Sequence, residues 1–296
     1  MRNRLLMALA ACVLLTPSLH ADCATDHDFR SDKNSGVLIA DFTITGTQTL
    51  SSAEVAGMAI KLTGSCFDEN SEEIEQRARA LFQDRGYFGV EVKSARIKPS
   101  DQLAIPKPAT LEAEVLEGPR YKLGEIKFVG NQAFSAAELR NAFPLKKGGL
   151  FARNGIAAGL NGVRNLYGAG GFLDWTAIPD VQILSNGTVA LTVTIKEGPQ
   201  YHMGELEILA KKELADKLQG EWDLAEGAIF DLAYISKYVS ANRSLLPPEF
   251  TPSDVQVIRN CPAASVEVRL PLDATDIASL SRPKNVECEK SDDAAK

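Results

Sequence analysis

Histidine is scarce in this sequence, and the common signatures of catalysis are missing. Of the 3 histidines, only His27 and His202 lie beyond residues 1–21. Neither G-x-S-x-G nor H-E-x-x-H occurs, so the sequence shows neither an activated nucleophile nor a zinc-binding helix. An enzyme is therefore the least favoured class, and we expect no catalytic residue, cofactor or metal ion.

The chain also has fewer positive than negative charges, and it has few long apolar runs. The chain has 32 Lys and Arg against 39 Asp and Glu, which is a formal net charge of −7. An acidic chain is a poor candidate for binding nucleic acid through bulk charge. Beyond residues 1–21, no run of about 18 or more apolar residues occurs, so we expect no membrane-spanning segment.

The first residues have the pattern of an export signal. Two arginines precede the apolar run 5–15, and the small residue Ala21 follows it. We therefore predict a signal peptide in residues 1–21. Acylation at Cys12, in a lipoprotein-like Leu-Ala-Ala-Cys box, is a less favoured alternative because the apolar run continues past it. A buried N-terminal helix is the remaining alternative.

Export would place the other cysteines in an oxidising compartment. Cys23 and Cys66 lie near one end of the chain, and Cys261 and Cys288 lie near the other. An even count that splits into two local pairs predicts two disulfides. The sequence alone does not choose among the possible pairings.

One ten-residue sequence motif, which we call the doubled phrase, occurs twice in the chain. Residues 117–126 read EGPRYKLGEI, and residues 197–206 read EGPQYHMGEL. A repeat of this length, with glycine and proline in the same places, indicates a tandem array of one supersecondary unit. Each copy ends one alternating apolar run and begins the next, so the phrase marks a turn between domains. The expected junction residues are Gly118, Pro119, Gly198 and Pro199.

Each repeat is expected to contain a strand, two helices and two further strands. In the second repeat, Ile156, Leu160 and Val163 recur at the spacing of one buried helix face. Asn186-Gly187 lies between two alternating runs and predicts a β-hairpin. The fold class is therefore α+β, with the helices on one sheet face. The expected boundaries are a polar leader at 22–36, units at 37–119, 120–199 and 200–272, of which the third is divergent, and a polar tail at 273–296.

Residues 114–134 are similar to a known family. Glu-Gly-Pro followed by Tyr-x-Leu-Gly-Glu-Ile-x-Phe-x-Gly-Asn resembles the polypeptide-transport-associated domains, called POTRA, and the resemblance extends over residues 37–272. It implies three POTRA-like units, each with two helices on a three-stranded mixed sheet. Such units form the periplasmic arm of outer-membrane β-barrels that fold other barrels or secrete polypeptides. Only 24 residues follow Leu272, so we expect an array without a barrel of its own, which acts by binding.

The resemblance also implies where the array binds. It places the second strand of each unit at an open sheet edge, whose unpaired N–H and C=O groups accept another extended chain. The expected partner is an outer-membrane β-barrel protein or its unfolded precursor, in the periplasm at the outer membrane. A proline at Gln182 is expected to abolish this binding. The alternative is an accessory subunit that docks one fixed folded partner. The expected edges are marked by Val90, Val92, Val181, Ile183, Val255 and Val257.

Overall fold

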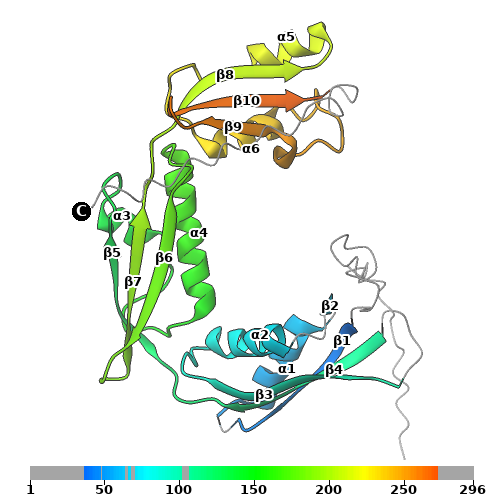
Figure 1. The fold of residues 1–296 in the computed structure, drawn as a ribbon, viewed down its shortest axis with the longest axis vertical. Helices are drawn as coiled ribbons and strands as arrows, with labels where there is room; N and C mark the ends of the chain where they lie inside the picture. Colours follow the sequence, from blue (N-terminus) through cyan, green and yellow to red (C-terminus); the bar gives the residue numbers. More distant parts are fainter. Residues whose placement is uncertain (1–36, 48, 64–65, 68–70, 102–106, 273–296) are drawn as a thin grey trace, which may run out of the picture. The chain divides into compact units, whose positions relative to one another are not determined.

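The structure is a computed structural model, and it describes residues 37–47, 49–63, 66–67, 71–101 and 107–272 (Figure 1). The predicted signal peptide, polar leader and polar tail lie outside these residues, as do Cys12, Cys23 and Cys288, and they stay predictions. The chain divides into two compact units. The first ends at Pro119, and the second comprises residues 84–86 and the chain from Arg120 onward.

The first compact unit is one mixed sheet covered by two helices. The sheet order is β2-β1-β4-β3, in which β4 runs parallel to β1 and antiparallel to β3. Figure 1 shows both helices on one face of this sheet. The short strand β2 pairs with β1 and adds a fourth strand that the sequence did not predict, because two residues carry no periodic pattern. The elements are β1 (Val37–Thr45), α1 (Ser52–Leu62), β2 (Cys66–Phe67), α2 (Ser71–Gln83), β3 (Glu91–Pro99) and β4 (Lys107–Leu116).

The second compact unit contains two further repeats of the same plan. Their sheet orders are β5-β7-β6 and β8-β10-β9, so the last strand of each repeat is central, parallel to the first and antiparallel to the second. The predicted α+β fold with mixed sheets is confirmed. The second repeat contains β5 (Lys122–Val129), α3 (Ala136–Asn141), α4 (Arg153–Ala169), β6 (Thr176–Ile183) and β7 (Thr188–Lys196). The third contains β8 (His202–Leu209), α5 (Lys212–Gly220), α6 (Leu232–Ala241), the 3₁₀ turn η1 (Pro252–Asp254), β9 (Gln256–Asn260) and β10 (Ser265–Pro271).

Capping boxes begin the first helix of the first two repeats. Ser51 Oγ accepts the Glu54 N–H at 3.3 Å, and Glu54 Oε2 accepts the Ser51 N–H at 2.9 Å. Ser135 and Glu138 form the same reciprocal pair at 3.3 and 2.8 Å. Each box satisfies N–H groups that the helix itself leaves unpaired. The corresponding helix of the third repeat, α5, has no side-chain cap.

The third repeat also leaves its second helix in a different way. Where the other repeats have glycine and an aromatic residue, this one has Pro247-Pro248. The Arg243 guanidinium holds the segment by donating to the Phe250 carbonyl at 2.5 Å and to the Pro247 carbonyl at 2.7 Å. A charged side chain with several donors thus replaces the left-handed glycine, Gly86 or Gly171, that follows the second helix of the other two repeats.

Each central strand buries a row of alternate side chains in its core, against the helices and the neighbouring strands. In β7 the side chains of Val189, Leu191, Val193 and Ile195 are buried, and they alternate with more exposed positions. Helix α4 contributes the buried face of Ile156, Val163 and Tyr167. In the third repeat the core includes Tyr201, Met203, Phe230, Val266, Val268 and Leu270. Period-two burial in strands and period-3.6 burial in helices fit the α+β pattern that the sequence predicts.

In the first two repeats a glycine follows the first strand, at the point where the chain passes close to the last strand of the same repeat. Gly46 and Gly130 have φ angles of +85° and +87°. A Cβ atom would lie 2.1 Å from the Val115 carbonyl oxygen at Gly46, and 2.2 Å from the Ile195 carbonyl oxygen at Gly130. Glycine is the one residue that adopts this backbone without a steric cost.

Gly130→Ala is expected to lower the free energy of unfolding by about 3 kcal/mol or more, because a backbone clash adds to left-handed strain. Gly187→Ala is the matched control. Gly187 has φ +75°, but its added Cβ would meet nothing within 4 Å, so the strain alone should cost about 1 kcal/mol. Urea denaturation followed by tryptophan fluorescence measures both. Equal losses in the two variants would contradict the clash.

Candidate functional site

The glutamate of each doubled phrase ties two distant parts of its repeat together. Glu117 Oε1 accepts the Thr49 N–H at 2.6 Å. Glu197 Oε1 accepts the N–H groups of Gln132 and Ala133 at 2.7 and 2.9 Å. The glycine and proline of the phrase predict a turn, but they give no role to the glutamate that precedes them. Its presence at the same place in both copies was the available signal.

A tyrosine hydroxyl completes this arrangement in the second repeat, and we call Glu197, Gln132, Ala133 and Tyr167 the Glu197 clasp. Tyr167 Oη donates to Glu197 Oε1 at 2.8 Å. Partial burial alone would raise the pKa of Glu197, but the donors from Gln132, Ala133 and Tyr167 outweigh it and hold the pKa below its usual value. Burial, followed by the hydrogen bond to this carboxylate, raises the pKa of Tyr167. The tyrosine is therefore a donor and the glutamate an acceptor throughout the neutral range.

The Glu197 clasp makes stability depend on pH. Because the folded-state pKa of Glu197 is lowered from 4.5, the unfolded chain binds more protons just below that pH. The stabilisation is present above about pH 4.5 and is lost as the pH falls through the lowered folded-state pKa. Glu197→Gln is expected to cost about 1–2 kcal/mol at pH 7 and to flatten this loss. Denaturation curves at several pH values measure it.

Glu226→Gln is the control for this experiment, since Glu226 is exposed and has no hydrogen bond or ion pair within the part of the chain that the structure describes. Its pH profile should match that of the wild type. A Glu197→Gln profile that also matches the wild type would show that the carboxylate contributes nothing.

An acidic residue joins the second repeat to the third. Asp174 follows α4, and its Oδ2 accepts the Tyr201 hydroxyl at 2.5 Å. Asp174 Oδ1 forms an ion pair with Arg259 Nη1 on β9. Burial, and then the hydrogen bond to Asp174, raises the pKa of Tyr201 to about 12. We call Asp174, Tyr201 and Arg259 the Asp174 junction.

The backbone reinforces the Asp174 junction next to the second doubled phrase. The Tyr201 N–H donates to the Gly171 carbonyl at 2.8 Å, and Gln200 Nε2 donates to the Gly170 carbonyl at 2.9 Å. Gly198 has φ +71° and carries the chain between strands β7 and β8. Gly118 has φ +66° between β4 and β5. The assignment of Gly118, Pro119, Gly198 and Pro199 as domain junctions stays a prediction, with backbone conformations that suit it.

Asp174→Asn is expected to loosen the second repeat from the third, because it removes the charge that binds Arg259 and weakens the acceptor of Tyr201. Spin labels at the exposed residues Asn161 and Lys217 would report this as a wider distance distribution in double electron-electron resonance. Asp216→Asn, an exposed acid on α5, is the control. A distribution as narrow as that of the wild type would mean that the ion pair does not hold the junction.

The second strand of the second repeat lies at the sheet edge. Within the described residues β6 pairs with β7 alone. The Leu184 N–H donates to the Thr188 carbonyl at 2.8 Å, just beyond the pair Ile183 and Val189. Hydrogen-bonded pairs alternate in an antiparallel ladder, so every second residue before Leu184, including Gln182, bonds to β7. The residues whose N–H and C=O groups point away from β7 are Ala177, Pro179, Val181 and Ile183.

This alternation corrects the expected position for a blocking proline. Gln182 was wrong, because it pairs with Ala190 in the ladder and a proline there would remove a hydrogen bond within the sheet. Val181 points its N–H outward and is the suitable position. Pro179 already lies on the same outward register, where a missing N–H costs no ladder bond.

The predicted edge residues lie at or just before the edge strands. On β6, Val181 is partly buried, whereas Ile183 is 47% exposed. In the first repeat, Val92 is buried within β3, which pairs with β4 alone among the described strands. Buried side chains belong to the core, so the groups that remain available at these edges are mainly backbone. Binding at any of these edges stays a prediction. The remaining positions are Val90, buried just before β3, Val255, buried just before β9, and Val257, partly buried in β9.

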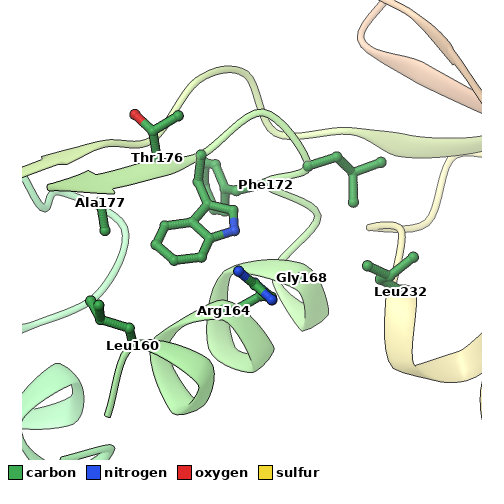
Figure 2. A pocket seen from close by; sticks show the side chains of 9 residues that line it. Leu160, Arg164, Gly168, Phe172, Thr176, Ala177 and Leu232 are labelled. Atoms are coloured by element: carbon green, nitrogen blue, oxygen red, sulfur yellow. The ribbon is translucent and has the colours of Figure 1, made fainter. Parts of the chain in front are cut away.

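A groove of about 510 Å³ lies between α4 and the beginning of edge strand β6. Figure 2 shows Leu160 and Arg164 on the helix side, Thr176 and Ala177 on the strand side, and Leu232 of α6 at one end. The groove is mostly apolar, with one charged side chain. Its apolar lining consists of Leu160, Phe172, Leu173, Trp175, Ala177 and Leu232.

The groove wall is connected to the Glu197 clasp. The Trp175 indole stacks on the Tyr167 ring, with 5.2 Å between the centroids and an interplanar angle of 9°. Tyr167 in turn donates its hydroxyl to Glu197. The clasp therefore fixes the ring against which Trp175 rests, and a packed ring of this kind loses little conformational freedom when a ligand binds.

The structure describes only two of the four cysteines in the predicted disulfides. Cys66 lies in β2 and Cys261 follows β9, but Cys23 and Cys288 lie outside the described residues, so the two disulfides stay predictions. Within the described ranges, no group of three or more His, Cys, Asp and Glu side chains could hold a metal ion. No helix in the same ranges has the length and apolar character needed to cross a membrane.

These features define a class of protein: a row of repeats in which each mixed sheet keeps its second strand at an edge. Residues 121–198 match the family model described as "POTRA: Surface antigen variable number repeat". The crystal structure of POTRA domains 3–5 of BamA from Haemophilus influenzae is similar over 79% of this chain and 95% of that one, with a TM-score of 0.56 and 19% identity. The predicted resemblance to POTRA repeats is confirmed.

Curated relatives are similar to this chain over part of their length. A "Putative outer membrane protein assembly factor" of Treponema pallidum is 26% identical over 202 residues, which is 67% of this chain and 24% of that protein. The "Outer membrane protein assembly factor BamA" of Neisseria meningitidis serogroup B is 24% identical over 228 residues, which is 72% of this chain and 28% of that protein. The chain thus spans about a quarter of the length of these relatives.

Proposed function

We propose that this protein is a non-enzymatic scaffold of outer-membrane protein assembly that binds extended polypeptide segments. The observation that carries the proposal is the outward row of backbone groups on β6, next to an apolar groove. Its curated relatives are described as assembly factors of the outer membrane. The proposed location is the periplasm, at the face of the outer membrane, where the two predicted disulfides could form.

Backbone recognition suits a protein that meets many clients. A segment added to β6 gains hydrogen bonds from groups that every residue carries, so binding does not require one sequence. Each such bond contributes about 1 kcal/mol, and ordering the segment offsets part of the gain. We therefore expect weak affinities, about micromolar to millimolar. Pro179 interrupts the row of donors, which further limits affinity and protects the edge from pairing with another copy of the chain.

Of the three second strands, β6 is the best supported edge. It has eight residues, compared with five in β9. Its groove-side neighbours, including Trp175, Phe172 and Ala177, offer apolar surface to alternate side chains of an added strand. Strand β3 is longer, with nine residues, but its register is interrupted by a bulge between Val92 and Ser94.

A second candidate function is docking to one folded partner through the open sheet face. Ile178 is 63% exposed and Val129 is 52% exposed. Both are paired with Thr194 on the central strand, so they form one row across the three strands on the face opposite α4. Exposed aliphatic side chains in such a row are typical of a contact surface. An accessory subunit with a fixed partner would use this row and leave the β6 edge free.

The Val181→Pro variant separates the two functions, because it removes one outward N–H and no ladder bond. We expect binding of an unfolded barrel precursor to weaken about fivefold or more, because one hydrogen bond of about 1 kcal/mol is lost, with a change in unfolding free energy of about 1 kcal/mol or less. Fluorescence anisotropy and urea denaturation measure these quantities. Val181→Ala is the matched control, since it trims the same side chain and keeps the N–H.

Ala177→Pro removes another outward N–H group of β6. It tests whether the effect of Val181→Pro comes from the lost N–H group or from a local distortion at position 181. Full-strength binding by folded Val181→Pro and Ala177→Pro would contradict recognition at this edge. If binding were lost instead in Ile178→Asp, the open face would be the contact surface and the second function would hold.

A further inference from the structure

A single cation lines the groove beside β6. Arg164 is exposed on α4, and no acidic residue is among the residues that line the groove with it. Figure 2 shows the Arg164 side chain on the helix side of the groove, between Leu160 and Gly168 along the helix. The chain as a whole has a net charge of −7. The groove lining is therefore cationic, in a chain whose net charge is negative.

No side chain among the residues that the structure describes competes for Arg164. Its guanidinium forms neither a hydrogen bond nor an ion pair within these residues. The nearby acid Asp174 is occupied by Arg259 and Tyr201. An arginine binds a carboxylate through two parallel N–H donors, and at an exposed position such as Arg164 the gain is modest.

The spacing along α4 matches the spacing along a bound strand. Leu160, Arg164 and Gly168 are four residues apart, so they lie on one helix face at steps of about 6 Å. Side chains on one face of a strand recur about every 6.6 Å. Figure 1 shows α4 beside β6 with nearly parallel axes. A segment paired to β6 therefore presents alternate side chains to these three positions in turn.

Each of these three positions on α4 favours a different side chain of the bound segment. Leu160 offers apolar contact. Gly168 has no side chain, and the nearest heavy atoms to an added Cβ are those of Leu232 at 3.6 Å. The Leu232 side chain fills the space over Gly168, so that end of the groove presents the apolar side chains of Leu232 and Trp175 to the bound segment. The middle position faces the guanidinium.

We propose that the β6 groove selects extended segments of the pattern apolar-x-acidic-x-apolar, with Arg164 as the specificity-determining residue. This proposal rests on the proposed function, in which β6 receives an added strand. The pattern is distinctive because it places a carboxylate on the same strand face as two apolar side chains. Segments that alternate only between apolar and neutral polar residues bind through the backbone alone and gain nothing from Arg164.

The test uses the full chain and three nine-residue peptides that differ only in a central Glu, Gln or Lys between apolar residues two positions away. Their ends are acetylated and amidated, so that the central side chain is the sole charge that varies. We expect the Glu peptide to bind about fivefold more tightly than the Gln peptide and about twentyfold more tightly than the Lys peptide. Fluorescence anisotropy measures the three dissociation constants, and added salt should reduce the differences.

Arg164→Glu should reverse the order of the three peptides. Lys147→Glu is the matched control, because Lys147 is exposed outside the groove and the substitution changes the net charge equally. The wild-type order should persist in this control. An Arg164→Glu variant that keeps the preference for Glu would overturn the role of Arg164.

The remaining outcomes separate this proposal from the function on which it rests. Equal affinities for the three peptides in the wild type, together with loss of binding in Val181→Pro, would overturn the selectivity and leave recognition at the edge intact. Absence of binding by every peptide would overturn both. Equal binding to wild type and Val181→Pro, with the preference for Glu retained, would place an acid-selective site away from the β6 edge.

Discussion

The parallel pairing of the first and last strands is the constraint on which the rest of each repeat depends. Parallel neighbours require a crossover, and two helices provide it, whereas in the second and third repeats the last two strands are joined by a short hairpin. The last strand therefore lies inside the sheet and the strand before it is left at the edge. An edge of this kind follows from connectivity and does not depend on any particular side chain.

Side chains refine what the connectivity provides. In the second repeat Glu197 holds the loop after β5 and the hydroxyl of Tyr167, and Tyr167 supports the Trp175 ring at the groove. Asp174, next to Trp175 in the sequence, binds Tyr201 and Arg259 of the third repeat. The same few residues thus shape the groove and connect it to the neighbouring repeat. A substitution at the Asp174 junction is therefore expected to change the shape of the groove at the β6 edge.

The features predictable from the sequence are those that local spacing determines. The Asn186-Gly187 hairpin and the apolar face of α4 with Ile156 and Val163 both depend on residues within a few positions of one another, and the structure contains both. The order of the strands came from the resemblance of residues 114–134 to POTRA repeats. With that order, the location of the second strand at an edge could be expected before the structure was known.

The features that the sequence did not predict depend on contacts between residues far apart in the sequence and on the register of paired strands. Glu197 bonds to Gln132, 65 positions away, and no local pattern indicates such a contact. The two-residue strand β2 is too short to produce a periodic signal. Gln182 and Val181 look equivalent in the sequence, and only the register with β7 shows which of them faces outward. The charge of the groove became visible when Arg164 and Trp175, eleven positions apart, were found to line one surface.

Residue-resolved amide hydrogen exchange on β6, with and without a saturating extended peptide, tests the central claim most directly. Free protein should show slow exchange at Ile178 and Gln182, which bond to β7, and fast exchange at the outward amides of Ala177, Val181 and Ile183. The peptide should slow exchange at these three outward amides and leave the ladder amides unchanged. Outward amides that exchange equally fast in the complex would contradict the claim that an added strand pairs with this edge.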